Sequence, residues 1–342
     1  MLFHKLYGNC KRAATAICVS ALALGCSDSE KSGKNEGQIC TSLPPLELKD
    51  SYRVGFAQLW EDRGPWRDAN TASMQDEAAA RGFELVYDPG TKSDPAEQVA
   101  RMQALIDEKV DVIFIAPHDE TVLAPSVVAA RRACIPVFVI DRAVDTTIAV
   151  PGEDYVSYLA SDFRKEGEMA AEWLIEKTGG EANIIELEGT IGSSPGVQRK
   201  QGFDALIKKQ PGMTILASES ADFNEQEAYE ATLRLVEQHP TVDVIYSHND
   251  AMSFGVITAL EELGLVPGED VLIVSIDGTK KAIEYVLDGK IGVVVECNPK
   301  FGPIAFDTML AYAAGEEVPL RVDNVDRIFD IDNAEDYLPE AY

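Results

Sequence analysis

Two aspartates follow apolar segments that share one pattern. Asp141 and Asp277 each end a largely apolar run, in Val139-Ile140-Asp141 and in Ser275-Ile276-Asp277. About 30 residues before each of them stands a second matched pair of segments, 110–114 (VDVIF) and 242–246 (VDVIY). The two pairs are offset by nearly the same number of residues, so we expect an internal duplication of one α/β unit. Chance similarity between two buried strands is the alternative.

The elements around these aspartates are typical of βαβ units. From Tyr52 onward, short apolar runs alternate with helical patterns, which predicts parallel sheets. We expect strands at 54–57, 83–87, 112–115 and 137–140, and a helix that begins at Asp94-Pro95. In open parallel sheets, ligands bind in the crevice outside the carboxyl ends of the strands. Asp141 and Asp277 are therefore expected to face one shared cleft, although such an aspartate can also simply cap the next turn or helix.

The composition is that of a globular, acidic protein. The chain has 342 residues, of which 46% are hydrophobic, and its formal charge is −28. This length fits two domains, and the apolar content excludes an intrinsically disordered chain. A surface this acidic repels phosphate groups, so binding to nucleic acid or to an anionic membrane surface is not expected.

The first 25 residues have the pattern of a secretory signal. A basic start precedes an apolar run at 13–24, which is too short to span a bilayer. Leu22-Ala23-Leu24-Gly25-Cys26 resembles a bacterial lipobox, with Ala23 and Leu24 standing where leucine and a small residue are more usual. We expect lipid on Cys26, a flexible tether over 26–51, and a periplasmic or extracytoplasmic location in which this lipid is the only link to the membrane. An ordinary signal cleaved nearby is the alternative.

The cysteines give no sign of a metal site or of a disulfide framework. The chain has six, and Cys40, Cys134 and Cys297 remain once Cys10 and Cys18 leave with the signal and Cys26 is acylated. Three is an odd number, and no spacing is typical of zinc. We therefore expect no essential disulfide and no metal.

Several spaced motifs resemble those of type I periplasmic sugar-binding proteins of ABC importers, and within them the galactofuranose-binding members. The motifs are Val139-Ile140-Asp141-Arg142, Glu186-Leu187-Glu188-Gly189-Thr190, Arg199-Lys200-Gln201-Gly202-Phe203, His248-Asn249-Asp250-Ala251-Met252 and Ser275-Ile276-Asp277-Gly278. Trp66-Arg67 and Val295-Glu296-Cys297-Asn298-Pro299 support the closer likeness. The resemblance implies two Rossmann-like lobes with parallel sheets, joined by a three-crossover hinge. The lobes would comprise 52–152 with 296–324, and 153–295 with 325–342.

The resemblance also implies which residues bind the sugar. Asp141, Asp277 and, from a crossover, Glu296 would accept hydrogen bonds from hydroxyl groups. Arg67, Arg142 and Arg199 would donate, and Asn249 would do both. An aromatic side chain would cover the C–H face, with the candidates ranked Trp66, Trp60 and Phe56. Core packing is the alternative for each tryptophan.

The implied function is to capture a monosaccharide, either galactofuranose or a related hexose or pentose, and to deliver it to an ABC permease. We expect a monomer without a cofactor. A sensory receptor of the same fold, feeding a chemoreceptor or kinase, is the main alternative. A glycosidase using Asp141, Asp277 and Glu296 is a remote one, because neighbouring arginines should keep these carboxylates ionised. The G-x-S-x-G sequence at 192–196 does not indicate a hydrolase, since Pro195 has no N–H for an oxyanion hole.

Overall fold

The computed structural model describes residues 39–59, 64–90 and 94–342. The expected signal peptide, the expected lipidation site Cys26 and the stacking candidate Trp60 lie outside the described residues. Within the described ranges, no helix has the length and apolar character needed to cross a bilayer.

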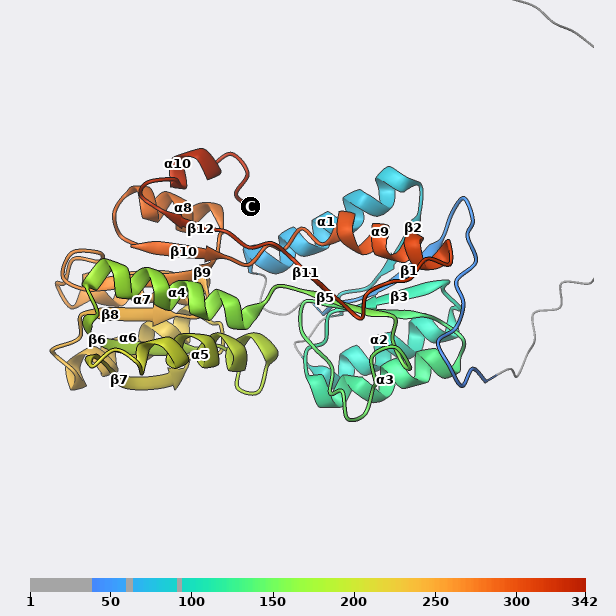
Figure 1. The fold of residues 1–342 in the computed structure, drawn as a ribbon, viewed down its shortest axis with the longest axis horizontal. Helices are drawn as coiled ribbons and strands as arrows, with labels where there is room; N and C mark the ends of the chain where they lie inside the picture. The colour runs from blue at the N-terminus through green and yellow to red at the C-terminus, as the bar shows by residue number, and fades with distance from the viewer. Residues whose placement is uncertain (1–38, 60–63, 91–93) are drawn as a thin grey trace, which may run out of the picture. The chain divides into compact units, whose positions relative to one another are not determined.

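The first lobe is built on a six-stranded parallel sheet (Figure 1). Its strand order is β11-β5-β4-β3-β1-β2, and every neighbouring pair is parallel. The strands are β1 (Arg53–Ala57), β2 (Glu84–Tyr87), β3 (Val112–Ile115), β4 (Val137–Ile140), β5 (Ser157–Ala160) and β11 (Arg321–Asp323). The strands expected from the sequence at 54–57, 83–87, 112–115 and 137–140 are confirmed as β1 to β4 to within one residue.

The second lobe repeats this plan. Its sheet has the order β12-β10-β9-β8-β6-β7, with β12 antiparallel to β10 and all other pairs parallel. The strands are β6 (Glu181–Glu188), β7 (Gly212–Ser220), β8 (Val244–Ser247), β9 (Leu272–Asp277), β10 (Val293–Glu296) and β12 (Ile328–Asp330). Because β4 and β9 occupy the same place in the two orders, Asp141 and Asp277 hold equivalent positions, as the repeated pattern predicts.

Helices cover both sheets. In the first lobe they are α1 (Pro65–Arg81), α2 (Pro95–Asp107), α3 (Glu120–Arg132) and α9 (Gly302–Ala313). In the second lobe they are α4 (Phe163–Thr178), α5 (Ser194–Ile207), α6 (Glu225–Gln238), α7 (Asp250–Glu262), α8 (Lys280–Leu287) and α10 (Ala334–Tyr337). The helix start expected at Asp94-Pro95 is confirmed, since the Asp94 side chain accepts the Ala96 N–H at the head of α2. The central strands β3, β4, β8 and β10 are buried on both faces, as in a parallel sheet between helical layers.

The chain passes between the sheets three times, over 161–162, 297–301 and 324–327. The first crossover was expected near Gly152, and this is wrong by about one strand. Gly152, with φ of 80°, belongs to a turn in which its N–H donates to the Tyr155 carbonyl at 2.9 Å. The turn leads back into the first sheet, because β5 pairs with β4. The turn at Gly152 therefore returns the chain to the first sheet and does not mark the boundary between the lobes.

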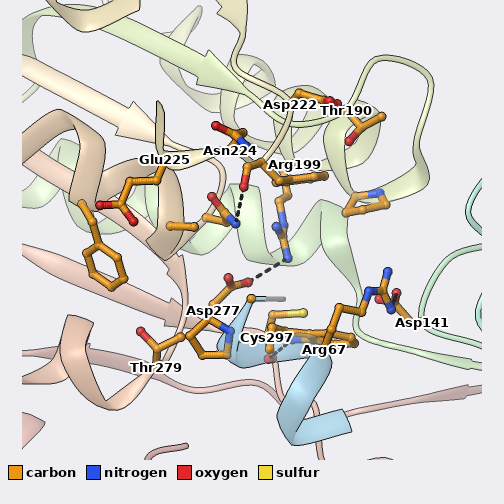
Figure 2. Close-up of a pocket in the computed structure, with 18 of the residues that line it drawn as sticks. Arg67, Asp141, Thr190, Arg199, Asp222, Asn224, Glu225, Asp277, Thr279 and Cys297 are labelled. Carbon is orange, nitrogen blue, oxygen red and sulfur yellow. Dashed lines mark hydrogen bonds and ion pairs between the residues drawn. The ribbon is translucent and has the colours of Figure 1, made fainter. Parts of the chain in front are cut away.

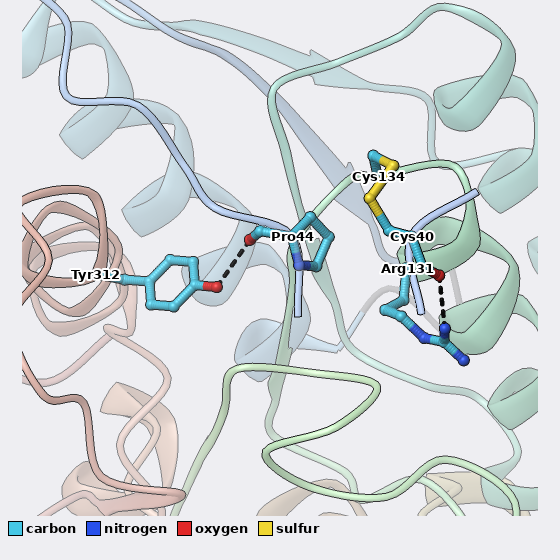
Figure 3. Close-up of a disulfide and its surroundings, with 5 residues drawn as sticks. All are labelled: Cys40, Pro44, Arg131, Cys134 and Tyr312. Atoms are coloured by element: carbon cyan, nitrogen blue, oxygen red, sulfur yellow. Dashed lines mark hydrogen bonds between the residues drawn. A yellow bond between two sulfur atoms is a disulfide. The ribbon is translucent and has the colours of Figure 1, made fainter. Parts of the chain in front are cut away.

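Residues 39–51 were expected in a flexible tether, but they lie against the first lobe. Leu46 is buried, and the Pro44 carbonyl accepts the Tyr312 hydroxyl at 2.7 Å. A disulfide joins Cys40 to Cys134, contrary to the expectation from the cysteine count (Figure 3). Arg131 Nη1 donates to the Cys40 carbonyl at 2.6 Å beside it. The two cysteines are 94 residues apart, so no local spacing could reveal the pair.

Replacing both Cys40 and Cys134 with serine should lower the free energy of unfolding by about 2–4 kcal/mol, because the closed loop restricts the unfolded chain. Urea unfolding followed by circular dichroism measures this change. The oxidised wild-type protein should lose the same amount on reduction, whereas the double variant should not respond to reductant. Equal stability of the oxidised wild type and the variant would contradict the structural role of this disulfide.

Candidate ligand-binding site

A cavity of about 710 Å³ is lined by loops and helix ends from both lobes (Figure 2). It receives residues that follow strands β3, β4, β6, β7, β8 and β9, which is the crevice outside the strand ends. Of the residues expected to bind sugar, seven line it: Trp66, Arg67, Asp141, Arg142, Arg199, Asn249 and Asp277.

Asp141 and Arg67 form the charged pair contributed by the first lobe. Asp141 follows β4 with φ of 60°, a left-handed conformation that aspartate tolerates better than most residues. Its Oδ2 lies 2.6 Å from Nη1 of Arg67, which is on the first turn of α1. The same Nη1 donates to Gln58 Oε1 at 3.1 Å. Both charged groups are therefore held at the cavity wall with little freedom to move.

Asp277 and Arg199 form the second pair, from the second lobe. Figure 2 shows the Arg199 guanidinium pointing toward the Asp277 carboxylate, with Nη2 3.9 Å from Oδ1. Arg199 also donates through Nε to Glu166 Oε2 and through Nη1 to the His248 carbonyl, each at 2.6 Å. Only 3% of Arg199 is exposed. Its planar fork is therefore fixed by two short hydrogen bonds before any ligand arrives.

The neighbouring arginine does not control the ionisation of Asp277, contrary to the sequence-based expectation. Burial raises the pKa of Asp277 well above its usual range, and the negative charge of Asp250 raises it further. Arg199 acts in the opposite direction, but at 3.9 Å it offsets only part of this. Burial is the stronger effect because only 6% of Asp277 is exposed to water.

Asp250 fixes the loop that carries Asp277. The Asp250 carboxylate accepts the Ser275 hydroxyl at 2.6 Å and the Thr279 hydroxyl at 2.8 Å. It also accepts the backbone N–H groups of Gly278 and Thr279, at 3.0 and 2.8 Å. These four hydrogen bonds to one buried carboxylate fix the backbone conformation of the segment 277–279. They hold Asp277 at φ of 137°.

Arg142 and Asn249 supply further polar groups to the cavity. Arg142 Nη1 donates to the His118 carbonyl at 3.2 Å. Asn249 is the N-cap of α7, and its Oδ1 accepts the Met252 N–H at 3.0 Å. Because the oxygen is engaged in capping, the Asn249 amide faces the cavity mainly as a donor.

Three aromatic side chains among the described residues line the cavity, Trp66 from the first lobe and Phe223 and Phe254 from the second. Trp66 donates its ring N–H to the Cys297 carbonyl at 2.8 Å, which fixes the plane of the ring. Phe223, which the sequence analysis missed, follows β7 in the left-handed conformation, with φ of 57°. The guanidinium carbons of Arg142 and Arg199 lie 5.9 and 5.8 Å from the centre of its ring.

Gly189 makes room for Phe223. A Cβ atom at position 189 would lie 2.0 Å from Phe223 Cζ, far inside van der Waals contact. No side chain larger than hydrogen fits there unless the phenyl ring moves. The glycine within the Glu186–Thr190 motif is therefore needed for packing, because it leaves space for the Phe223 ring at the cavity wall of the second lobe.

Two expected site residues lie away from the cavity. Phe56 is 1% exposed and packs against Tyr87, with ring centres 5.2 Å apart, so it belongs to the core. Glu296 is bound to Arg327 Nε at 2.8 Å and to the Tyr337 hydroxyl at 3.1 Å. It therefore supports the second lobe and does not line the cavity. The expectation that Glu296 completes the acceptor set from a crossover is wrong for this structure.

Several other residues that were not expected to bind sugar also line the cavity. They include His118, Thr190, Pro195, Asp222, Asn224, Glu225, Phe254, Thr279, Lys281 and Cys297. Asp222 to Glu225 lie between the end of β7 and the first residue of α6. They are therefore at the carboxyl edge of the second sheet, as Asp277 is. Recognising β7 in the sequence would have placed Phe223 at the cavity by the same argument.

Comparisons with known proteins agree with this arrangement. The family model that describes the periplasmic binding protein domain matches residues 55–317 of this chain. The galactofuranose-binding protein of Escherichia coli K12 is 32% identical over 285 residues, covering 82% of this chain and 88% of that protein. The crystal structure of a galactofuranose-binding protein aligns with a TM-score of 0.79 at 31% identity, over 84% of this chain and 98% of the other. A Mycobacterium smegmatis structure with β-D-fucofuranose aligns with a TM-score of 0.78 at 34% identity, over 84% and 94%.

The chain therefore belongs to the periplasmic binding protein family. The identification as a type I sugar-binding member, made from the sequence motifs, is confirmed by the matched family model, the relative and the shared fold.

Proposed function

We propose that this chain is an extracytoplasmic lipoprotein that binds one monosaccharide in furanose form and hands it to an ABC permease. The observation that carries the proposal is a single cavity with a carboxylate and guanidinium pair from each lobe, Asp141 with Arg67 and Asp277 with Arg199. A sugar hydroxyl both donates and accepts, so adjacent carboxylate and guanidinium groups satisfy both of its functions.

The aromatic walls complement the rest of such a ligand. A sugar ring has a C–H face of low polarity, and Trp66 and Phe223 provide flat apolar surfaces for it in the two lobes. A hexose has about 12 heavy atoms, so micromolar affinity needs about −0.7 kcal/mol per atom, within the range of small, well-matched ligands. The furanose form is favoured because the similar proteins are described with galactofuranose and β-D-fucofuranose.

Export and delivery rest on separate support. The Cys40–Cys134 disulfide is typical of an oxidising compartment such as the periplasm. The expected signal and Cys26 would provide the lipid anchor, and the family resemblance supplies the permease as partner. A sensory role with the same ligand would use the same cavity, and it differs only in the protein that receives the closed complex.

The glycosidase alternative loses support from the geometry. It needs Glu296 beside Asp141 and Asp277, but Glu296 is paired with Arg327 and Tyr337 away from the cavity lining. Of the two carboxylates that remain, that of Asp141 is held 2.6 Å from Nη1 of Arg67. We therefore propose binding without turnover.

A thermal-shift screen of free pentoses and hexoses, with methyl β-D-galactofuranoside and methyl β-D-galactopyranoside added, tests the proposal. A ligand at one hundred times its Kd stabilises the folded state by about 2.7 kcal/mol, which gives a clear shift in Tm. We expect furanose-forming sugars and the galactofuranoside to stabilise the protein, and the pyranoside to have little effect. The absence of a shift with every sugar would contradict sugar binding, and an equal shift with both glycosides would contradict the furanose preference.

A further inference from the structure

His248 lies fully buried behind the cavity wall of the second lobe. It stands between Ser247, the last residue of β8, and Asn249, the N-cap of α7. It does not itself line the cavity. A histidine that is buried in this way needs a hydrogen-bond partner for each ring nitrogen, and the structure supplies one for each.

The two partners of the His248 ring select one tautomer. The Gly189 N–H donates to Nδ1 at 3.3 Å, so Nδ1 carries no proton. Nε2 lies 3.1 Å from Glu186 Oε1, and an ionised carboxylate can only accept, so Nε2 carries the proton. Burial lowers the pKa of His248 below its usual range, and Glu186 offsets only part of this. The ring is therefore neutral at pH 7, with a donor on one side and an acceptor on the other.

Glu186, on β6, is a fixed anion for this ring to donate to. Its side chain is fully buried, and its Oε2 accepts the Lys200 ammonium and the Ser218 hydroxyl. Burial alone would raise the pKa of Glu186, but the hydrogen bonds from His248 and Lys200 lower it to about 2. Glu186 therefore stays ionised and keeps the proton of His248 on Nε2.

The other side of the ring reaches the aromatic wall of the cavity through Gly189. The Gly189 N–H is held by His248, and the Gly189 carbonyl accepts the Ser220 hydroxyl at 2.8 Å. The Phe223 ring occupies the space where a Cβ atom at position 189 would lie. A shift of the Gly189 backbone would therefore push the Phe223 ring or leave a gap behind it.

The main chain of His248 supports the guanidinium of the same lobe. Its carbonyl accepts Arg199 Nη1 at 2.6 Å, and its N–H donates to the Leu187 carbonyl at 3.1 Å. The backbone and the ring are thus both bound to the segment 186–189 at the end of β6. One residue outside the cavity lining is in contact with the supports of both Arg199 and Phe223.

We propose that His248 is a positioning residue of the sugar site, whose ring holds Gly189 through Nδ1 and thereby sets the Phe223 ring against the C–H face of the sugar. This inference rests on the proposed sugar-binding function. It gives the buried pair of His248 and Glu186 a role in binding, although neither residue contacts the ligand.

Two substitutions at position 248 separate the roles of the two ring nitrogens. Asparagine places an amide oxygen near the position of Nδ1, so His248→Asn keeps an acceptor for the Gly189 N–H. Glutamine reaches the position of Nε2, so His248→Gln keeps the donor to Glu186 but leaves the Gly189 N–H without its acceptor. With the tightest ligand from the screen, calorimetry should show Kd raised about tenfold in His248→Gln and within threefold of wild type in His248→Asn.

The control is His239, a half-buried histidine at the end of α6 in the same lobe. His239→Asn and His239→Gln should both bind as the wild type does, because His239 does not line the cavity. Both variants at position 248 lose the packing of the imidazole ring, so a merely structural role predicts similar Kd values for the two. A Kd in His248→Asn that equals or exceeds that of His248→Gln, or a Kd in His248→Gln within threefold of wild type, would overturn the inference.

Nitrogen-15 NMR of the wild-type histidine rings tests the same contact without any loss of stability. At pH 7 one ring, whose signals are absent from both variants at position 248, should be neutral with its proton on Nε2. A proton on Nδ1, or a doubly protonated ring, would overturn the inference even if neither variant folds. A wild-type protein that has the expected tautomer but binds no sugar would instead overturn the proposed function.

Discussion

Replacing Arg199 with methionine is expected to abolish sugar binding and to lower the free energy of unfolding by about 3–5 kcal/mol. The substitution removes the partner of Glu166, which is only 1% exposed, and leaves an isolated charge inside the protein. It also removes the two short hydrogen bonds that place the guanidinium beside Asp277. Urea unfolding and calorimetric titration measure the two effects separately.

Arg164→Met is the matched control for this prediction. Arg164 lies on the neighbouring helix α4 and pairs with Glu168 at 3.3 Å, but half of its side chain is exposed. An exposed pair of this kind contributes at most about 1 kcal/mol, and neither of its residues lines the cavity. A double variant, Arg199→Met with Glu166→Leu, should recover much of the lost stability without recovering binding. Similar stability losses at positions 199 and 164 would contradict the buried-pair account.

Replacing Asp141 with alanine should raise Kd for the sugar at least a hundredfold. The carboxylate accepts from ligand hydroxyls in the proposed complex, and each hydrogen bond to a charged group is worth about 1.5–3 kcal/mol. The loss of stability should be smaller, about 1–2 kcal/mol, chiefly because alanine tolerates φ of 60° less well than aspartate. Calorimetric titration gives the first quantity and urea unfolding the second.

Two further variants sharpen the test of Asp141. Asn tolerates the same backbone conformation and keeps one acceptor oxygen, so Asp141→Asn should bind with an affinity between those of wild type and Asp141→Ala. Asp107→Ala, at an exposed aspartate at the end of α2, should bind as the wild type does. If Asp141→Ala bound within threefold of wild type, Asp141 would not be a ligand-binding residue.

The parts of the fold that the sequence predicts are those set by local patterns. The runs at 112–115 and 137–140, rich in β-branched residues, predict buried strands, and the cap at Asp94 and Pro95 predicts where α2 begins. The repeat of these patterns also placed Asp141 and Asp277 at equivalent strand ends. That inference needs only chain order and the geometry of parallel sheets.

The features that sequence reasoning missed depend on contacts between distant segments. The disulfide between Cys40 and Cys134 joins residues that are 94 positions apart. Glu296 does not line the cavity because its carboxylate is bound to Arg327, which lies in the next crossover. Phe223 reaches the cavity because Gly189, in another loop, leaves room for its ring. Burial overrides Arg199 in setting the pKa of Asp277, and burial is a property of the folded chain.

A calorimetric titration of the purified wild-type protein tests the central claim most directly. The galactofuranoside, or the best sugar from the screen, should bind with a stoichiometry of one per chain and a Kd in the micromolar range or below, because one cavity carries both charged pairs. The sugar recovered after the titration should be chemically unchanged. No measurable heat with any monosaccharide at millimolar concentration, or steady release of a hydrolysed product, would contradict the account.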